Sequence, residues 1–229
     1  GKNGRCIVLR NRMNALAAVM LALWGSAVGD ASGAEVSLKD GRWHVNGQVT
    51  NPLSPAEGLL MNVRMVNATF EDLNDQTGHA EFDADKNTSE FIARIPVYAA
   101  LGVNAFTLCL QGGMPGYEGA INSAFRADGS LVPQYLVRVR RVIEACDHAN
   151  VVVILGCYYQ RQSKILKDDD ALRAGVVNVV NWITSSGFKN VLLEVTNEYP
   201  HPGFAHPLLR DPQGQASLVR LAKQTSPGL

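Results

Sequence analysis

The chain has 229 residues, of which 46% are hydrophobic and 18% charged, and its 21 basic residues balance its 21 acidic ones. This composition is typical of a globular domain and argues against general disorder. The balanced charge gives no electrostatic footprint for nucleic acid or for an anionic membrane surface, so we expect an uncharged, polar or small-molecule partner.

The beginning of the chain, residues 1–34, matches the pattern of a secretory signal peptide. A basic flank precedes a short apolar stretch, residues 15–24, and small residues follow it, with a cleavage site expected near Ala34. The apolar stretch is too short to span a bilayer comfortably. Met13 stands where an initiator is expected, so residues 1–12 are interpreted either as upstream translated sequence or as a gene-model error. The mature chain is expected to be secreted or periplasmic, with a buried N-terminal helix as the alternative for this stretch.

Signal removal would leave three cysteines, Cys109, Cys146 and Cys157, without any C-x-x-C spacing. This odd number supports neither a disulfide framework nor a zinc site. Cys109 and Cys157 lie within apolar runs, where a free cysteine acts as a small hydrophobic side chain. One disulfide among the three remains an alternative in an exported protein.

Residues 35–57 are expected to form a β-hairpin and a linker. An Asp-Gly dipeptide at residues 40–41 and an Asn-Gly dipeptide at residues 46–47 separate short alternating segments. Both dipeptides tolerate the positive φ angles that hairpin turns need. Two prolines then mark the linker.

The remainder, residues 58–229, alternates between apolar runs and segments with helical spacing. The expected strands cover residues 58–66, 103–110, 151–158 and 189–196. The expected helices cover residues 88–101, 131–149, a segment from one of Asp168, Asp169 or Asp170 to about Ser185, and 213–225. Thr88 or Ser89 is the expected cap of the first helix, and Pro96 is a candidate kink.

Continuously apolar strands separated by helices indicate an α/β protein with a parallel sheet. That leaves a (β/α)8 TIM barrel or an open doubly wound sheet. No glycine-rich phosphate turn follows the first strand, and polar and aromatic residues cluster just after the strands, so we favour the barrel. A barrel usually takes about 250 residues. Because the sequence holds only about four βα units, we expect it to be the N-terminal half of a barrel.

The segment VLLEVTNEYP, residues 191–200, carries Glu194 inside the fourth strand and breaks into Asn197-Glu198 just before a proline. It resembles the strand-four signature of the retaining (β/α)8 glycoside hydrolases, specifically the cellulase-like family 5 or a sister family of the same clan. The segment RWHVNGQVT, residues 42–50, also looks like that family's opening. The resemblance implies a glycosidase that cleaves O-glycosidic bonds of a poly- or oligosaccharide.

By this resemblance Glu198 is the general acid/base, and Asn197 hydrogen-bonds the substrate 2-hydroxyl. Glu194 points to the same side of the strand but deeper, so it is interpreted as structural, with Arg64 as its expected partner. The nucleophile of the resembled family is a second carboxylate that ends strand seven. No other acidic residue sits at a predicted strand end, so we expect the fragment alone to be inactive.

Other strand-end residues are candidate substrate contacts. Tyr158 and Tyr159 could stack on a sugar face, with core packing as the alternative for one of them. Gln111 could bond a sugar hydroxyl or only form a turn. The sequence departs from family 5 where an arginine normally lies near the end of strand two and a histidine near the end of strand three, because it has LCLQGG and LGCYYQ there. A sister family with the same barrel is therefore an alternative.

No metal or organic cofactor is expected. His201 and His206 lie in a proline-rich loop that fixes no relative geometry, and no third ligand accompanies them. The aspartates at residues 168–170 are interpreted as the acidic start of a helix. We expect a monomer with a carbohydrate partner, no nucleic acid and, after signal removal, no membrane association. The rival hypothesis is a non-catalytic carbohydrate-binding TIM barrel; a metal-dependent hydrolase would need His and Asp ligands at strand ends, and the first strand has none.

Overall fold

The computed structural model describes residues 33–77, 82–112 and 119–228. The predicted signal peptide, apart from its last two residues, lies outside these described residues. The described residues contain a three-stranded antiparallel sheet and a four-stranded parallel sheet. In these parts of the chain, no helix is long and apolar enough to cross a membrane.

The small sheet confirms the predicted hairpin and extends it by a third strand. Its strands are β1 (Val36–Lys39), β2 (Arg42–Val45) and β3 (Gln48–Val49), paired in that order. Asp40 and Gly41 in the first turn have φ angles of 51° and 72°, and Asn46 and Gly47 in the second have 52° and 75°. Two successive residues with positive φ define the turn type that matches the twist of paired strands, which is why the two dipeptides marked both turns.

The large sheet contains four parallel strands in sequence order. They are β4 (Asn62–Arg64), β5 (Ala105–Cys109), β6 (Val152–Tyr158) and β7 (Val191–Thr196). Each lies within one of the predicted strands; β4 is the shortest because only its three residues pair with β5. Among the described residues, no strand pairs with the outer edge of β4 or of β7. The structure therefore confirms an α/β protein with a parallel sheet.

A helix follows each parallel strand, in the order α1 (Ala84–Ala100), α2 (Pro133–His148), α3 (Asp169–Ser185) and α4 (Pro212–Thr225). Asp83 and Asp168 cap α1 and α3, because each side chain accepts a hydrogen bond from a backbone N–H of the first turn. The predicted cap of α1, Thr88 or Ser89, was wrong. Thr88 lies inside α1, fully buried, and its hydroxyl donates to the Ala68 carbonyl. Pro96 also lies inside α1, which continues beyond it to Ala100.

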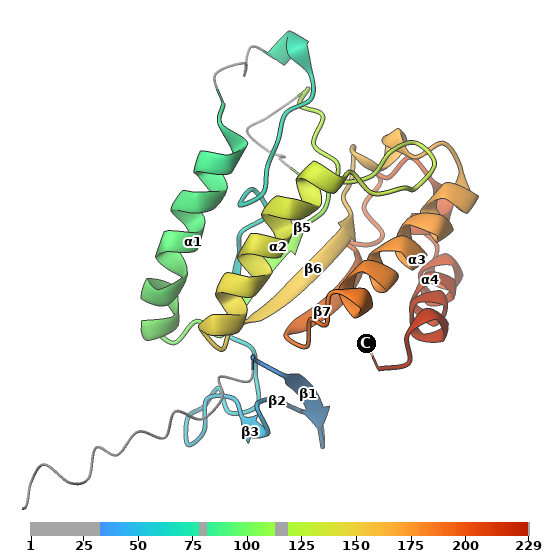
Figure 1. Ribbon diagram of the computed structural model, residues 1–229. Coiled ribbons are helices and arrows are strands. Elements are labelled where there is room, and N and C mark those ends of the chain that lie inside the picture. Colours follow the sequence, from blue (N-terminus) through green and yellow to red (C-terminus); the bar gives the residue numbers. More distant parts are fainter. Residues whose placement is uncertain (1–32, 78–81, 113–118, 229) are drawn as a thin grey trace, which may run out of the picture. The chain divides into compact units, whose positions relative to one another are not determined.

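The two faces of the parallel sheet carry different side chains. The helices cover one face, where the apolar core lies (Figure 1): Phe106, Leu108, Val153, Leu155 and Cys157. The alternation of the strands turns a mixed set to the opposite face, where the polar residues Asn62, Arg64, Thr107 and Glu194 lie among apolar ones such as Ala105 and Ile154. On that face the Asn62 amide donates to the Thr107 hydroxyl at 2.8 Å. Only the helix-covered face is thus continuously apolar.

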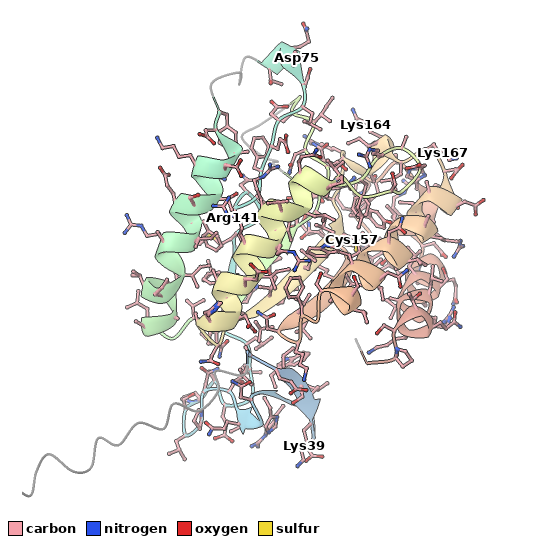
Figure 2. The ribbon with its side chains drawn as sticks, viewed as in Figure 1. Lys39, Asp75, Arg141, Cys157, Lys164 and Lys167 are labelled. Atoms are coloured by element: carbon pink, nitrogen blue, oxygen red, sulfur yellow. The ribbon has the colours of Figure 1, made fainter. Side chains whose placement is uncertain are left out.

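The two ends of the parallel sheet are also different. At the N-terminal end of the strands the hairpin is attached, because the Val36 N–H donates to the carbonyl of Lys189, just before β7, at 2.9 Å. The loops that follow the strands lie at the other end and include three short helices: η1 (Asp75–Thr77), η2 (Ser163–Ile165) and η3 (Pro207–Leu209). Figure 2 shows Lys39 of the hairpin at one end and Lys164 of η2 at the other.

Gly129 is a position where the fold leaves no room for a side chain. Its φ is +82°, and a Cβ atom there would lie 2.2 Å from the Ala171 carbonyl oxygen in α3. Gly41 has a similar φ of +72°, but its Cβ would meet nothing within 4 Å. We expect Gly41→Ala to lower the free energy of unfolding by about 1 kcal/mol. We expect Gly129→Ala to lower the free energy of unfolding by about 1–3 kcal/mol more than Gly41→Ala does, because the added Cβ would clash with backbone atoms of α3. Chemical denaturation measures both, and equal losses would contradict the packing argument.

Candidate active site

Polar residues meet where β4, β6 and β7 end. Arg64 is the last residue of β4, Tyr159 and Gln160 follow β6, and Asn197 and Glu198 follow β7. Parallel strands bring their carboxyl ends to the same edge of a sheet, so residues that are distant in sequence become neighbours there. This cluster is the candidate active site.

Asn197 is only 1% exposed, and its backbone N–H and both ends of its side-chain amide take part in hydrogen bonds. Its backbone N–H donates to the Tyr158 carbonyl at 3.0 Å. Its Oδ1 accepts from Nη2 of Arg64 at 2.6 Å, and its Nδ2 donates to Oε1 of Gln160 at 3.4 Å. A guanidinium can only donate, so Arg64 decides which end of the Asn197 amide is the oxygen.

Glu198 comes directly after Asn197 but is exposed. Strand alternation, which was expected to place the side chains of Glu194 and Glu198 on the same side, ends before Glu198. β7 ends at Thr196, and Glu198 has a φ of 52° in the left-handed region, so this turn sets the direction of its side chain. One carboxylate oxygen, Oε2, accepts a hydrogen bond from Nε2 of Gln160 at 3.0 Å.

Glu194 lies lower on the polar face of the sheet, opposite Gly156 of β6. Its Oε2 is buried and has no hydrogen-bond partner among the described residues. Burial raises the pKa of Glu194, the positive charge of Arg64 lowers it, and the negative charge of Glu198 raises it further. The expected pairing of Arg64 with Glu194 takes the form of a charge interaction, since Arg64 is exposed and its Nη2 donates to Asn197.

The two adjacent tyrosines have different surroundings. Tyr159 is 5% exposed, burial raises its pKa, and Arg64 hydrogen-bonds its side chain. Tyr158 is 1% exposed and belongs to the core. Its hydroxyl donates to the Leu172 carbonyl at 2.5 Å, and its ring lies 5.2 Å from that of Phe125. Core packing, the alternative for one of the pair, therefore applies to Tyr158.

Gln111 is fully buried in the loop after β5. Its Nε2 donates to the Ser123 hydroxyl at 3.0 Å and to the Gln162 carbonyl at 3.3 Å, while its Oε1 accepts from the Tyr159 N–H at 3.2 Å. Both ends of the amide are occupied, so Gln111 supports the loops around the site and is not open to a sugar hydroxyl in this arrangement.

The described residues contain no group of three or more His, Cys, Asp or Glu side chains that could hold a metal ion. His201 accepts a hydrogen bond from a nearby backbone N–H, and Nε2 of His206 contacts backbone carbonyls. Cys109, Cys146 and Cys157 are free and buried. Burial raises the pKa of Cys109 and Cys146 to about 12, which keeps these thiols protonated and unreactive near neutral pH.

Gln160 and Arg64 are the members of the cluster that sequence reasoning did not assign to the site. Gln160 directly follows a predicted strand, which is a signal for its place at the sheet end. Its two partners depend on how the loops pack, and that packing leaves no pattern in the sequence. Arg64 was placed inside a longer strand, whereas β4 ends at this residue.

No protein-family model and no curated protein sequence matches the chain. The fold is similar to that of a glycoside hydrolase family 5 structure from Bacteroides vulgatus ATCC 8482, with a TM-score of 0.53 and 11% identity over 86% of this chain and 38% of that one. It is also similar to an endo-1,4-beta-mannanase from Eisenia fetida, with a TM-score of 0.50 and 16% identity over 86% of this chain and 60% of that one. The chain thus shares a fold with part of each of these glycoside hydrolases and spans less than two thirds of their lengths.

The raised pKa of Glu194 predicts a pH-dependent effect of Glu194→Gln. An acid whose pKa is raised by folding lowers stability as pH rises from its unfolded value, about 4.5 here, through its folded value. Glutamine does not ionise. We therefore expect the free energy of unfolding of Glu194→Gln, relative to wild type, to increase from pH 4.5 toward neutral pH. Urea denaturation across this range measures it, with Glu90→Gln on the exposed surface of α1 as the control. A relative stability that does not change with pH would contradict the assignment.

Proposed function

We propose that this chain is part of a retaining glycoside hydrolase that cleaves O-glycosidic bonds of a poly- or oligosaccharide. The observation that carries the proposal is the Asn197-Glu198 pair directly after a parallel strand, in a fold shared with glycoside hydrolases. Glu198 is the general acid/base, and Asn197 hydrogen-bonds the 2-hydroxyl of the sugar, as the family 5 resemblance implies.

The geometry of the cluster supports these two roles. Glu198 is exposed, and among the described residues its hydrogen bond is the one from Gln160 to Oε2, which leaves Oε1 to reach a glycosidic oxygen. The amide nitrogen of Asn197 carries two protons, of which one faces Gln160, so the other can donate to a substrate hydroxyl. Tyr159 remains in the proposed site through its contact with Arg64. Tyr158 packs in the core and Gln111 holds the loops beside the site, so neither is a proposed substrate contact.

We propose that the parallel sheet is half of a (β/α)8 barrel, closed by further βα units. An apolar groove of about 1170 Å³ runs beside β7 and the hairpin, away from Glu198. Its lining includes Leu38, Leu59 and Val219, which are 59%, 56% and 49% exposed. An unpaired strand edge beside exposed apolar surface needs a cover in a stable protein. A strand paired to β7 and a helix packed against α4 would supply that cover.

The retaining mechanism needs a second carboxylate about 5–5.5 Å from the first. In the resembled family this nucleophile ends strand seven of the barrel. Glu194 does not fit that role, because it lies inside β7, just before the turn that carries the acid/base, and is partly buried, which raises its pKa. We therefore place the nucleophile on the closing units and expect the half sheet alone to be inactive.

We further propose that the protein works outside the cytoplasm as a monomer, without metal or organic cofactor, after removal of residues 1–34. The basic flank, the apolar stretch and the small residues near Ala34 support export.

The rival function is a non-catalytic barrel that binds carbohydrate and keeps some residues at the mouth. The two functions differ at one position, the end of the seventh strand in the complete gene product. A glutamate at that strand end supports the enzyme, and any non-acidic residue there supports the binding protein.

The role of Glu198 predicts a dependence on the leaving group. We expect Glu198→Ala in the complete gene product to reduce kcat/KM about 10²–10⁴-fold for aryl glycosides with poor leaving groups. Good leaving groups need little protonation, so the reduction in kcat/KM should be much smaller for aryl glycosides that carry them. Initial rates on a series of aryl glycosides measure this, with Glu90→Ala as the surface control. An equal loss for all leaving groups would contradict the acid/base role.

A further inference from the structure

The side chains between Arg64 and Glu198 form one chain of hydrogen bonds with a single direction. Nη2 of Arg64 donates to Oδ1 of Asn197 at 2.6 Å. Nδ2 of Asn197 donates to Oε1 of Gln160 at 3.4 Å, and Nε2 of Gln160 donates to Oε2 of Glu198 at 3.0 Å. Every link therefore runs from donor to acceptor along the path from the cation to the carboxylate.

The two ends of this chain fix its direction. A guanidinium has only donors and an ionised carboxylate has only acceptors, whereas an amide has one end of each kind. If the amide of Asn197 or Gln160 rotated by half a turn, two donors would face each other at one end of the amide and two acceptors at the other. Asn197 and Gln160 are only 1% and 9% exposed, so water could not easily replace the lost bonds.

Gln160 is itself held in place by the loop after β7. A Cβ atom on Gly203 would lie 3.1 Å from Cβ of Gln160, so the two segments are in close contact. The next residue along, Arg161, donates its backbone N–H to the Gly203 carbonyl at 2.9 Å. The loops after β6 and β7 are thereby joined at Gln160.

We propose that Gln160 is a positioning residue that acts through its two neighbours. It fixes which end of the Asn197 amide is presented to a ligand, and it occupies one oxygen of Glu198 so that the other faces the substrate. The consequence for catalysis rests on the proposed function. The directed hydrogen-bond chain does not, and it can be measured without substrate.

The first test is NMR spectroscopy of the ¹⁵N-labelled complete gene product, without substrate. In wild type we expect the side-chain amide of Asn197 to have an order parameter near that of rigid backbone, about 0.85, and in Gln160→Met to fall below about 0.6. Methionine keeps the length of glutamine but has no amide donor or acceptor group. Gln134→Met, the same change on the exposed surface of α2, should leave Asn197 unaffected. A mobile Asn197 amide in wild type would overturn the proposal even if Gln160→Met failed to fold.

The second test uses the complete gene product. If Asn197 and Glu198 act on a glycoside, Gln160→Met should lower kcat/KM by about tenfold to a hundredfold, the range for a hydrogen bond to a charged group. Gln134→Met should retain wild-type activity. A rigid Asn197 in an inactive protein would refute the glycosidase but keep the hydrogen-bond chain. An active enzyme whose Asn197 amide and rate are unchanged by Gln160→Met would refute the role of Gln160 and keep the glycosidase.

Discussion

Because β4, β5, β6 and β7 are parallel, their carboxyl ends all lie at one end of the sheet, and the hairpin is attached at the opposite end. Arg64 and Asn197, 133 positions apart in sequence, come within hydrogen-bonding distance for this reason. The strand register sets how far each side chain lies from the carboxyl ends of the strands. Glu194 pairs with Gly156 inside the sheet, so it lies before the strand ends. A side chain in place of Gly156 would have its Cβ only 3.0 Å from Oε2 of Glu194, so the glycine provides the space that this carboxylate occupies.

Burial imposes the second constraint on the site. Polar groups that leave water must find partners, and the loops after the strands bury several amides. Gln111 meets this requirement by joining three segments through its amide, and Asn197 meets it through Arg64 and Gln160. The result is a hydrogen-bonded base beneath an exposed carboxylate, Glu198. Such a base suits a group that must be presented in one orientation.

The elements that could be predicted are those that leave a periodic or local signal. The four parallel strands, their helices and the two hairpin turns all carry such signals, and their approximate positions were predicted. Errors arose where tertiary contacts decide the outcome. Thr88 has the residue type of a helix cap, but it lies inside α1 and donates a hydrogen bond to Ala68. Tyr158 follows the sequence pattern of an accessible strand-end residue, as Tyr159 does, but its hydroxyl donates to Leu172 of α3. The direction of Glu198 depends on a left-handed turn at a residue that is not glycine, which no local pattern announces.

Arg64 acts through its charge on Glu194, the carboxylate inside β7. Its positive charge lowers the pKa of Glu194, against burial and the negative charge of Glu198, which both raise it. Arg64 is exposed here, and water weakens its interactions. Closing the sheet into a barrel would remove that water from the polar face and strengthen each of these charge effects. A second carboxylate in the barrel proposed above would add negative charge near Arg64, so an arginine at the end of β4 is physically suited to the proposed site with two carboxylates.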